Sequence, residues 1–121
     1  MELQRVHTDD RGGIYSITSE LFESPEVAIL HTKAGYARGG CIHHENSEHL
    51  CVLEGLIEYV YGDKTVRLST GQSITIGKSV PHYFTSVTDS VVAEWGPKPE
   101  EKQAKHDEFR KIVLDINAKL K

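Results

Sequence analysis

The sequence has few of the residues and segments that mark secreted, disulfide-linked or membrane proteins. It contains two cysteines in 121 residues, a number more typical of free thiols than of a disulfide framework. No apolar run approaches the length of about 20 residues that a transmembrane helix needs. The first residues lack the apolar stretch of a secretory signal. We therefore expect a cytoplasmic protein that does not bind a membrane.

The sequence is also short of basic charge. Its 14 Lys and Arg residues face 18 Asp and Glu residues, which gives a net charge of −4 at pH 7. A chain with this balance has no basic surface for the phosphates of nucleic acids. Its length is that of one domain, and its 38% of hydrophobic residues is ordinary for a globular protein. We expect a single domain whose partner is a small molecule.

Short segments rich in β-branched and aromatic residues follow one another between residues 11 and 95. Gly, Pro, Asn, Asp and Ser separate them about every 8–12 residues, which is the spacing of short strands. The sequence YGDK at 61–64 is typical of a hairpin turn. This rhythm predicts an all-β sandwich or small barrel. The expected strands are residues 14–17, 26–32, 49–54, 57–62, 64–69, 72–77, 80–86 and 90–95.

The composition changes near residue 97. Beyond it, apolar residues recur at the spacing of one helix face, namely at Phe109, Ile112, Val113, Ile116 and Leu120. The acidic segment 96–101 is expected to open the helix, and Lys119 and Lys121 to end it. We expect residues 1–97 to form a barrel and residues 98–121 an amphipathic helix that packs on the barrel or on a second subunit.

The middle of the chain concentrates histidines and both cysteines. Because alternate residues of a strand share a face, Cys41 and His43 should point the same way. If residues 45–47 form a turn that closes a hairpin between His43 and Glu48, then Glu48 lines that face as well. Cys51 then lies on the opposite face, so a disulfide between the two cysteines is not expected. His44 and His49 point outward as well.

His82 lies on a later strand and can complete a site in the barrel. Two imidazoles and a carboxylate on separate strands could hold Zn, Ni, Fe or Mn with open coordination positions. A thiolate from Cys41 would favour the softer of these metals. The alternative is a hydrogen-bonded cluster of His43, Glu48 and His82 without a metal.

These residues resemble the first sequence motif of the cupin superfamily, G-x5-H-x-H-x3,4-E-x6-G. Its positions are filled here by Gly35, Cys41, His43, Glu48 and Gly55. Only the first His of the motif departs, and Cys41 stands in its place. An alternative alignment through His44 puts Ile42 at that position and requires a different hairpin register.

The second cupin motif, G-x5-P-x-G-x2-H-x3-N, is matched in spacing. Its positions are filled by Gly71, Gly77, Ser79, His82 and Ser86, of which the first Gly and the His keep their identity. The resemblance implies the double-stranded β-helix, or jelly-roll barrel, of cupins, with a C-terminal helix here. It also implies that His43, Glu48 and His82 are metal ligands and that the protein is a homodimer. Cys41 occupies the position of a fourth ligand.

Two stretches resemble a narrower branch, the sugar-nucleotide ketoisomerase, epimerase and capsule-synthesis cupins. They are DRG at 10–12 and YARGGCIHH at 36–44. Many enzymes of that branch need no metal, because a His moves the proton and Arg residues hold the nucleotide phosphates. The resemblance implies that His43 and His82 are catalytic and that Arg38 contacts an anionic substrate. We expect the rings of Tyr36 and Phe84 to contact the substrate from the pocket wall.

Three functions remain open from the sequence. The first is a metal-dependent enzyme acting on a small, oxygen-rich molecule, with carbohydrate derivatives as one candidate class. The second is metal-free ketoisomerisation or epimerisation of a nucleotide sugar, with His43 as acid/base. The third is a non-catalytic cupin that binds a small ligand. We prefer the first, because a metal site explains why Glu48 and His82 are both present.

Overall fold

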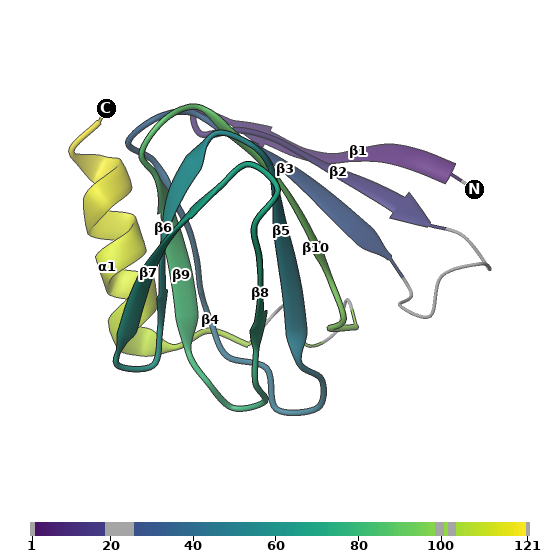
Figure 1. Cartoon of the computed structure of the whole chain (residues 1–121). Coiled ribbons are helices and arrows are strands. Elements are labelled where there is room, and N and C mark those ends of the chain that lie inside the picture. The colour runs from purple at the N-terminus through teal and green to yellow at the C-terminus, as the bar shows by residue number, and fades with distance from the viewer. Residues whose placement is uncertain (1, 19–25, 99–100, 102–103, 121) are drawn as a thin grey trace.

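The computed structural model describes residues 2–18, 26–98, 101 and 104–120. Within them, two antiparallel sheets face one another and a helix lies against the smaller sheet (Figure 1). The larger sheet has the strand order β1-β2-β3-β10-β5-β8, and the smaller has β4-β9-β6-β7. The elements are β1 (Glu2–Asp9), β2 (Gly12–Thr18), β3 (Val27–Thr32), β4 (Ala37–Cys41), β5 (Glu48–Glu54), β6 (Leu56–Tyr61), β7 (Lys64–Ser69), β8 (Ser73–Ile76), β9 (His82–Ser86), β10 (Ser90–Trp95) and α1 (Asp107–Ala118). The predicted all-β jelly-roll with a helix after it is confirmed.

The core lies between the two sheets and follows the alternation of the strands. Every second residue is buried along β9, and also as far as Val52 in β5 and Tyr59 in β6. The largest fully buried side chain is that of Tyr59 in β6. On β5, Glu48 shares the inward face with Leu50 and Val52, and on β9 His82 shares it with Phe84. The polar residues at these strand ends therefore extend the apolar core into a site.

The predicted hairpin between His43 and Glu48 is wrong. β4 pairs with β9 in the smaller sheet, whereas β5 pairs with β10 and β8 in the larger one. Residues 42–47 carry the chain from one sheet to the other, and His43 lies in this connection. The register of β4 against β9 shifts between Gly39 and Cys41, so simple alternation ends there.

Helix α1 is shorter than the predicted 98–121. It begins after the N-cap His106, and its acidic first turn is Asp107 and Glu108 rather than the segment 96–101. Its last turn contains no basic residue, and Lys121 lies outside the described residues. The preceding residues run along β4 instead of joining the helix, because the edge of β4 offers them backbone partners.

Residues 104–117 cover the outer edge of β4. The backbone of Ile42 bonds to Ala104, and that of His106 bonds to Gly40. Further along, the side-chain amide of Asn117 accepts from the Ala37 N–H at 2.8 Å and donates to its carbonyl at 3.0 Å. An edge strand that would otherwise expose its ladder is thereby satisfied over its whole length.

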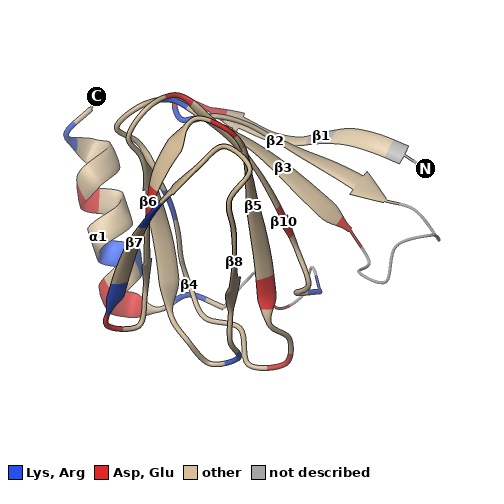
Figure 2. Cartoon of the chain, in the orientation of Figure 1, with Lys and Arg blue, Asp and Glu red and all other residues tan. Residues whose placement is uncertain are grey.

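Helix α1 packs its apolar side on β4 and β9. Val113 is fully buried, and the ring of Phe109 meets Tyr83 edge-on at 5.2 Å between centroids. Basic and acidic positions alternate along the helix (Figure 2), so its outer side is not uniformly basic. Among the described residues, no helix has both the length and the apolar character that crossing a membrane requires.

Candidate metal centre

Three polar side chains meet at one end of the core. His43 comes from the β4–β5 connection, Glu48 opens β5 and His82 opens β9. All are buried, with exposures of 3 to 4%. One ligand atom from each lies within 4.8 Å of the others. Elements far apart in sequence thus bring together the three residues that the sequence predicted.

Glu48 lies between the two imidazoles. Its Oε2 is 3.0 Å from His82 Nε2, and its Oε1 is 3.7 Å from His43 Nε2. The hydroxyl of Tyr59 donates a hydrogen bond to Glu48 Oε2 at 3.3 Å. The ring centroids of His43 and His82 are 5.0 Å apart. Both Nε2 atoms and the carboxylate therefore face one common point.

Backbone carbonyls fix the orientation of both histidines. His43 Nδ1 donates to the Glu101 carbonyl at 3.2 Å, and His82 Nδ1 donates to the Val80 carbonyl at 3.0 Å. Because a carbonyl can only accept, each Nδ1 carries a proton, and Nε2 is the nitrogen that faces Glu48. Metal-ligating histidines are usually held in this way.

Electrostatics couple the carboxylate to its neighbours. Burial alone would raise the pKa of Glu48, but the hydrogen bonds and charges of His43 and His82 hold it well below its usual range. Burial lowers the pKa of His82, yet the bond to Glu48 outweighs it and the net shift is upward. A carboxylate kept ionised in a buried site, with two imidazole nitrogens facing it, is a donor set that fits a divalent transition metal.

A cavity of about 220 Å³ adjoins these residues. Phe84 and Ile14 contribute apolar wall, and Cys41 and Arg38 also line it. Of its charged side chains, four are cations and two are acids: Arg11, Arg38, Lys105, Arg110, Glu48 and Glu94. The space is smaller than the 300–1,000 Å³ typical of drug-sized sites, so it suits a small molecule.

Cys41 lines this cavity without joining the cluster. In the described part of the chain, the group of metal-binding atoms within reach of one another consists of His43, Glu48 and His82. The Lys105 ammonium lies 3.8 Å from the Cys41 sulfur. Burial raises the pKa of the Cys41 thiol, although Lys105 acts against it. Both cysteines are free, as expected, and ligation by Cys41 stays a prediction.

The other predicted residues take different positions. Arg38 and Phe84 line the cavity beside the cluster, whereas Tyr36 lines a neighbouring cavity of about 510 Å³. His44 is exposed and bonded to a serine hydroxyl, which favours the alignment through His43. His49 stacks on Trp95, away from the core.

Several residues of the site are not indicated by the sequence motifs. Lys105 and Arg110 reach the cavity from the segment that covers β4, and Arg11 reaches it from the β1–β2 turn. The carbonyl of Glu101, which orients His43, is a backbone group, so the identity of the residue at this position does not indicate its role. The DRG stretch was the one signal that pointed to Arg11.

The sequence profile described as "Cupin domain" matches residues 29–95, more than half of the chain. This chain is a cupin. A comparison with curated proteins gave no match. In this cupin, His43, Glu48 and His82 stand at the positions of the family motifs, with Cys41 at the position of the first His.

Solved structures with the same fold include proteins of several kinds. CapF, the capsular polysaccharide assembling protein of Staphylococcus aureus, is 19% identical with a TM-score of 0.70, over 84% of this cupin and 31% of CapF. The cupin thus spans about a third of CapF. KdgF from Halomonas sp. is 17% identical with a TM-score of 0.61, over 83% of this chain and 91% of KdgF. Salicylate 1,2-dioxygenase from Pseudoaminobacter salicylatoxidans is 18% identical with a TM-score of 0.55, over 59% of this chain and 19% of that enzyme. At these identities the similarity shows the fold alone.

Proposed function

We propose that this cupin holds a divalent transition metal on His43, Glu48 and His82 and acts on a small, oxygen-rich molecule in the adjoining cavity. The observation that carries the proposal is the convergence of three buried donor groups, two of which are histidines already oriented by backbone carbonyls. Both imidazoles turn Nε2 to one point beside a cavity while Nδ1 is held by a carbonyl, which is the arrangement usual for metal-ligating histidines.

The bound metal would polarise a carbonyl or enediolate oxygen of the substrate. The residues of the chain supply the rest. His43, Glu48 and His82 leave open coordination positions on the cavity side, since three donors do not complete the shell of Zn, Ni, Fe or Mn. Arg38 and Phe84 line the space that the substrate would fill, which supports their predicted role as substrate contacts.

Metal analysis of untagged protein tests the proposal. After incubation with each of the four metals and gel filtration, we expect about one equivalent of metal per chain for at least one of them. Glu48→Ala should abolish retention. Glu58→Ala should not, because Glu58 pairs with Arg67 through partly exposed side chains. Less than about a tenth of an equivalent with every metal would overturn the proposal.

A second candidate is metal-free isomerisation or epimerisation of a nucleotide sugar. The fold shared with CapF and the orientation of His43 favour it, because Nδ1 is held by the Glu101 carbonyl while the ring lines the cavity as an acid/base would. Chelator-treated protein should then be stabilised against heat by dTDP- or UDP-sugars and convert them. Stabilisation without turnover would instead assign a non-catalytic ligand-binding cupin.

A further inference from the structure

Arg38 is a buried guanidinium whose hydrogen bonds go to neutral groups. Its exposure is 3%, although it lines the cavity. Nε donates to Thr32 Oγ1 at 2.8 Å, and Nη2 donates to the His31 carbonyl at 3.0 Å. These two acceptors fix the plane of the guanidinium without neutralising its charge. Burying such a charge is costly unless an anion comes to it.

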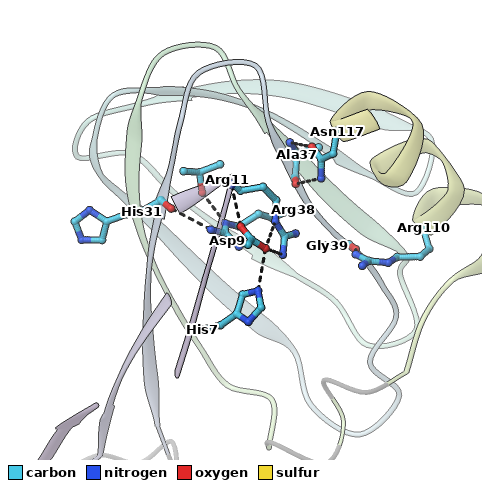
Figure 3. Close-up of polar contacts among 10 residues, drawn as sticks. His7, Asp9, Arg11, His31, Ala37, Arg38, Gly39, Arg110 and Asn117 are labelled. Carbon is cyan, nitrogen blue, oxygen red and sulfur yellow. Dashed lines mark hydrogen bonds and ion pairs between the residues drawn. The ribbon is translucent and has the colours of Figure 1, made fainter. Parts of the chain in front are cut away.

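A second guanidinium lies in the same polar cluster (Figure 3). Arg11, in the turn between β1 and β2, is held by Asp9, with Oδ2 accepting from its Nε at 2.9 Å and its Nη2 at 2.6 Å. Burial and then the charge of Arg11 lower the pKa of Arg38 to about 10, although the charges of Asp9 and Glu94 act against this. The two cations are therefore near enough to repel each other, which an anion bound between them would relieve.

The remaining charges of the cavity favour an anion too. Lys105 and Arg110 bring two further cations to its wall, against the two acids Glu48 and Glu94. A metal ion on Glu48 would add positive charge on the same side. The cavity therefore has an excess of positive charge, held in a small and partly apolar space where charge interactions are strong.

We propose that the substrate is a small organic acid whose carboxylate is bound by Arg38 and Arg11, with its hydroxyl or carbonyl oxygens facing His43, Glu48 and His82. A guanidinium fork matches a carboxylate in geometry. A carboxylate fits better than a phosphate dianion, because Asp9, which pairs with Arg11, and Glu94, which lines the same cavity, already offset part of the positive charge of the two arginines. The placement of the substrate's hydroxyl or carbonyl oxygens near His43, Glu48 and His82 rests on the proposed function. The placement of its carboxylate at the two arginines does not.

Arg11 is then a specificity-determining residue supplied by the β1–β2 turn. Asp9 holds it in place and is itself bonded to His7 at 2.9 Å, so a small network sets the position of the guanidinium. Arg11 also lines the neighbouring cavity with Tyr36. An acid with a longer tail can therefore place its carboxylate at the boundary between the two cavities.

Paired ligands that differ in one carboxyl group test the proposal. The probes are D-glucuronate with D-glucose, glycolate with ethylene glycol, lactate with propane-1,2-diol, and glucose 6-phosphate as the phosphate arm. Thermal shift and titration calorimetry are run on metal-loaded and on chelator-treated protein. At least one acid should raise the melting temperature, its neutral partner should not, and the phosphate should bind more weakly than the acid.

Variants assign the effect to the arginines. Arg38→Gln should weaken binding of that acid by about 30-fold or more, since it removes one side of a buried charge pair. Arg67→Gln, an exposed arginine at the Glu58 pair, should leave binding unchanged. Should Arg38→Gln fail to fold by circular dichroism, Arg11→Gln takes its place, with an expected loss of about tenfold.

The outcomes separate this inference from the proposed function. Equal binding of acids and neutral partners, tighter binding of the phosphate, no response to any acid, or no loss in the arginine variants would each overturn it. Acid binding to a protein that retains no metal would support the carboxylate site while the metal proposal fails. Metal binding without any acid binding would do the reverse.

Discussion

The carboxylate of Glu101 holds the turn that carries His43 into the site. It accepts hydrogen bonds from the backbone N–H groups of Glu45, Asn46 and Lys98, at 3.1, 2.9 and 2.8 Å. The side chain of Asn46 adds another at 2.7 Å. Burial raises the pKa of Glu101, but these hydrogen bonds outweigh it and lower the pKa to about 2.

We expect Glu101→Ala to lower the free energy of unfolding by about 2 kcal/mol, at about 0.5 kcal/mol for each of the four hydrogen bonds. The low value per bond allows for solvent screening at this partly exposed side chain. The backbone carbonyl of residue 101 also orients His43, so loosening the segment should reduce metal affinity by about tenfold. Urea denaturation of metal-free protein measures the first effect, and competition with a chelator measures the second.

The low pKa also fixes the pH range of the effect. Ionised Glu101 stabilises the fold fully above its unfolded-state pKa of 4.5, and this contribution is lost as the pH falls towards about 2. The stability difference between wild type and Glu101→Ala should therefore be constant above about pH 5.5 and shrink below it. Glu45→Ala, exposed in the same turn, should match wild type. A difference below about 0.5 kcal/mol at pH 7, or one that persists unchanged at pH 2.5, would refute this role of the carboxylate.

Three further predictions concern the edge of β4 and the metal. Asn117→Ala should lower the free energy of unfolding by about 2 kcal/mol in urea denaturation, because the N–H and carbonyl of buried Ala37 lose their partner. Lys111→Ala, on the exposed side of α1, should lower it by less than about 0.5 kcal/mol. Equal losses in the two variants would contradict the edge contact. Gly40→Ala should lower the free energy of unfolding by about 3 kcal/mol or prevent folding, since the added Cβ would lie 2.5 Å from the backbone of helix α1 at a φ of +79°. Gly71→Ala, at a φ of +86° with open space around it, should lower it by only about 1 kcal/mol. Saturating metal should raise the free energy of unfolding of the wild type by about 3–4 kcal/mol in the same assay and should not raise that of Glu48→Ala. A similar gain in both proteins would place the metal elsewhere.

The part of the fold that the sequence predicts is the part where local pattern and burial agree. In β5 and β9, alternating residues face the core, so a period of two identifies both the strand and its inner face. β1 lies outside the predicted strands because its residues are mainly polar and its apolar side chains, Leu3 and Val6, are exposed. Nothing in its local pattern distinguishes such a strand from a loop.

The sequence correctly predicts that His43, Glu48 and His82 lie together, but the hairpin predicted to bring two of them together is wrong. His43 and Glu48 do face the same interior, but Glu48 reaches it from the larger sheet and His43 from the connection that leaves the smaller sheet, rather than from one hairpin. Motif spacing counts residues along the chain and does not specify which strands pair. Helix α1 begins late for a related reason, since the edge of β4 takes up the preceding residues, and that contact joins positions about 60 to 80 residues apart.

The cationic wall of the cavity shows the limit of sequence reasoning most clearly. Arg11, Arg38 and Arg110 come from three separate regions. Arg11 and Arg38 stand in the two stretches that resemble the narrower cupin branch, whereas no sequence motif indicates Arg110. Exposed arginines are common, so their identity alone carries little information. Their significance comes from burial and from convergence on one cavity, which only the folded chain shows.

The contacts of Glu101 and residues 104–117 with His43 and β4 set an order of events during synthesis. A ribosome releases the chain from its N-terminus, so both sheets can begin to pair before these residues emerge. Until they do, His43 lacks the carbonyl that orients it, and the edge of β4 is open to other strands. If the proposed metal site is correct, the nascent chain is a weak competitor for cellular metal until these residues have emerged and oriented His43.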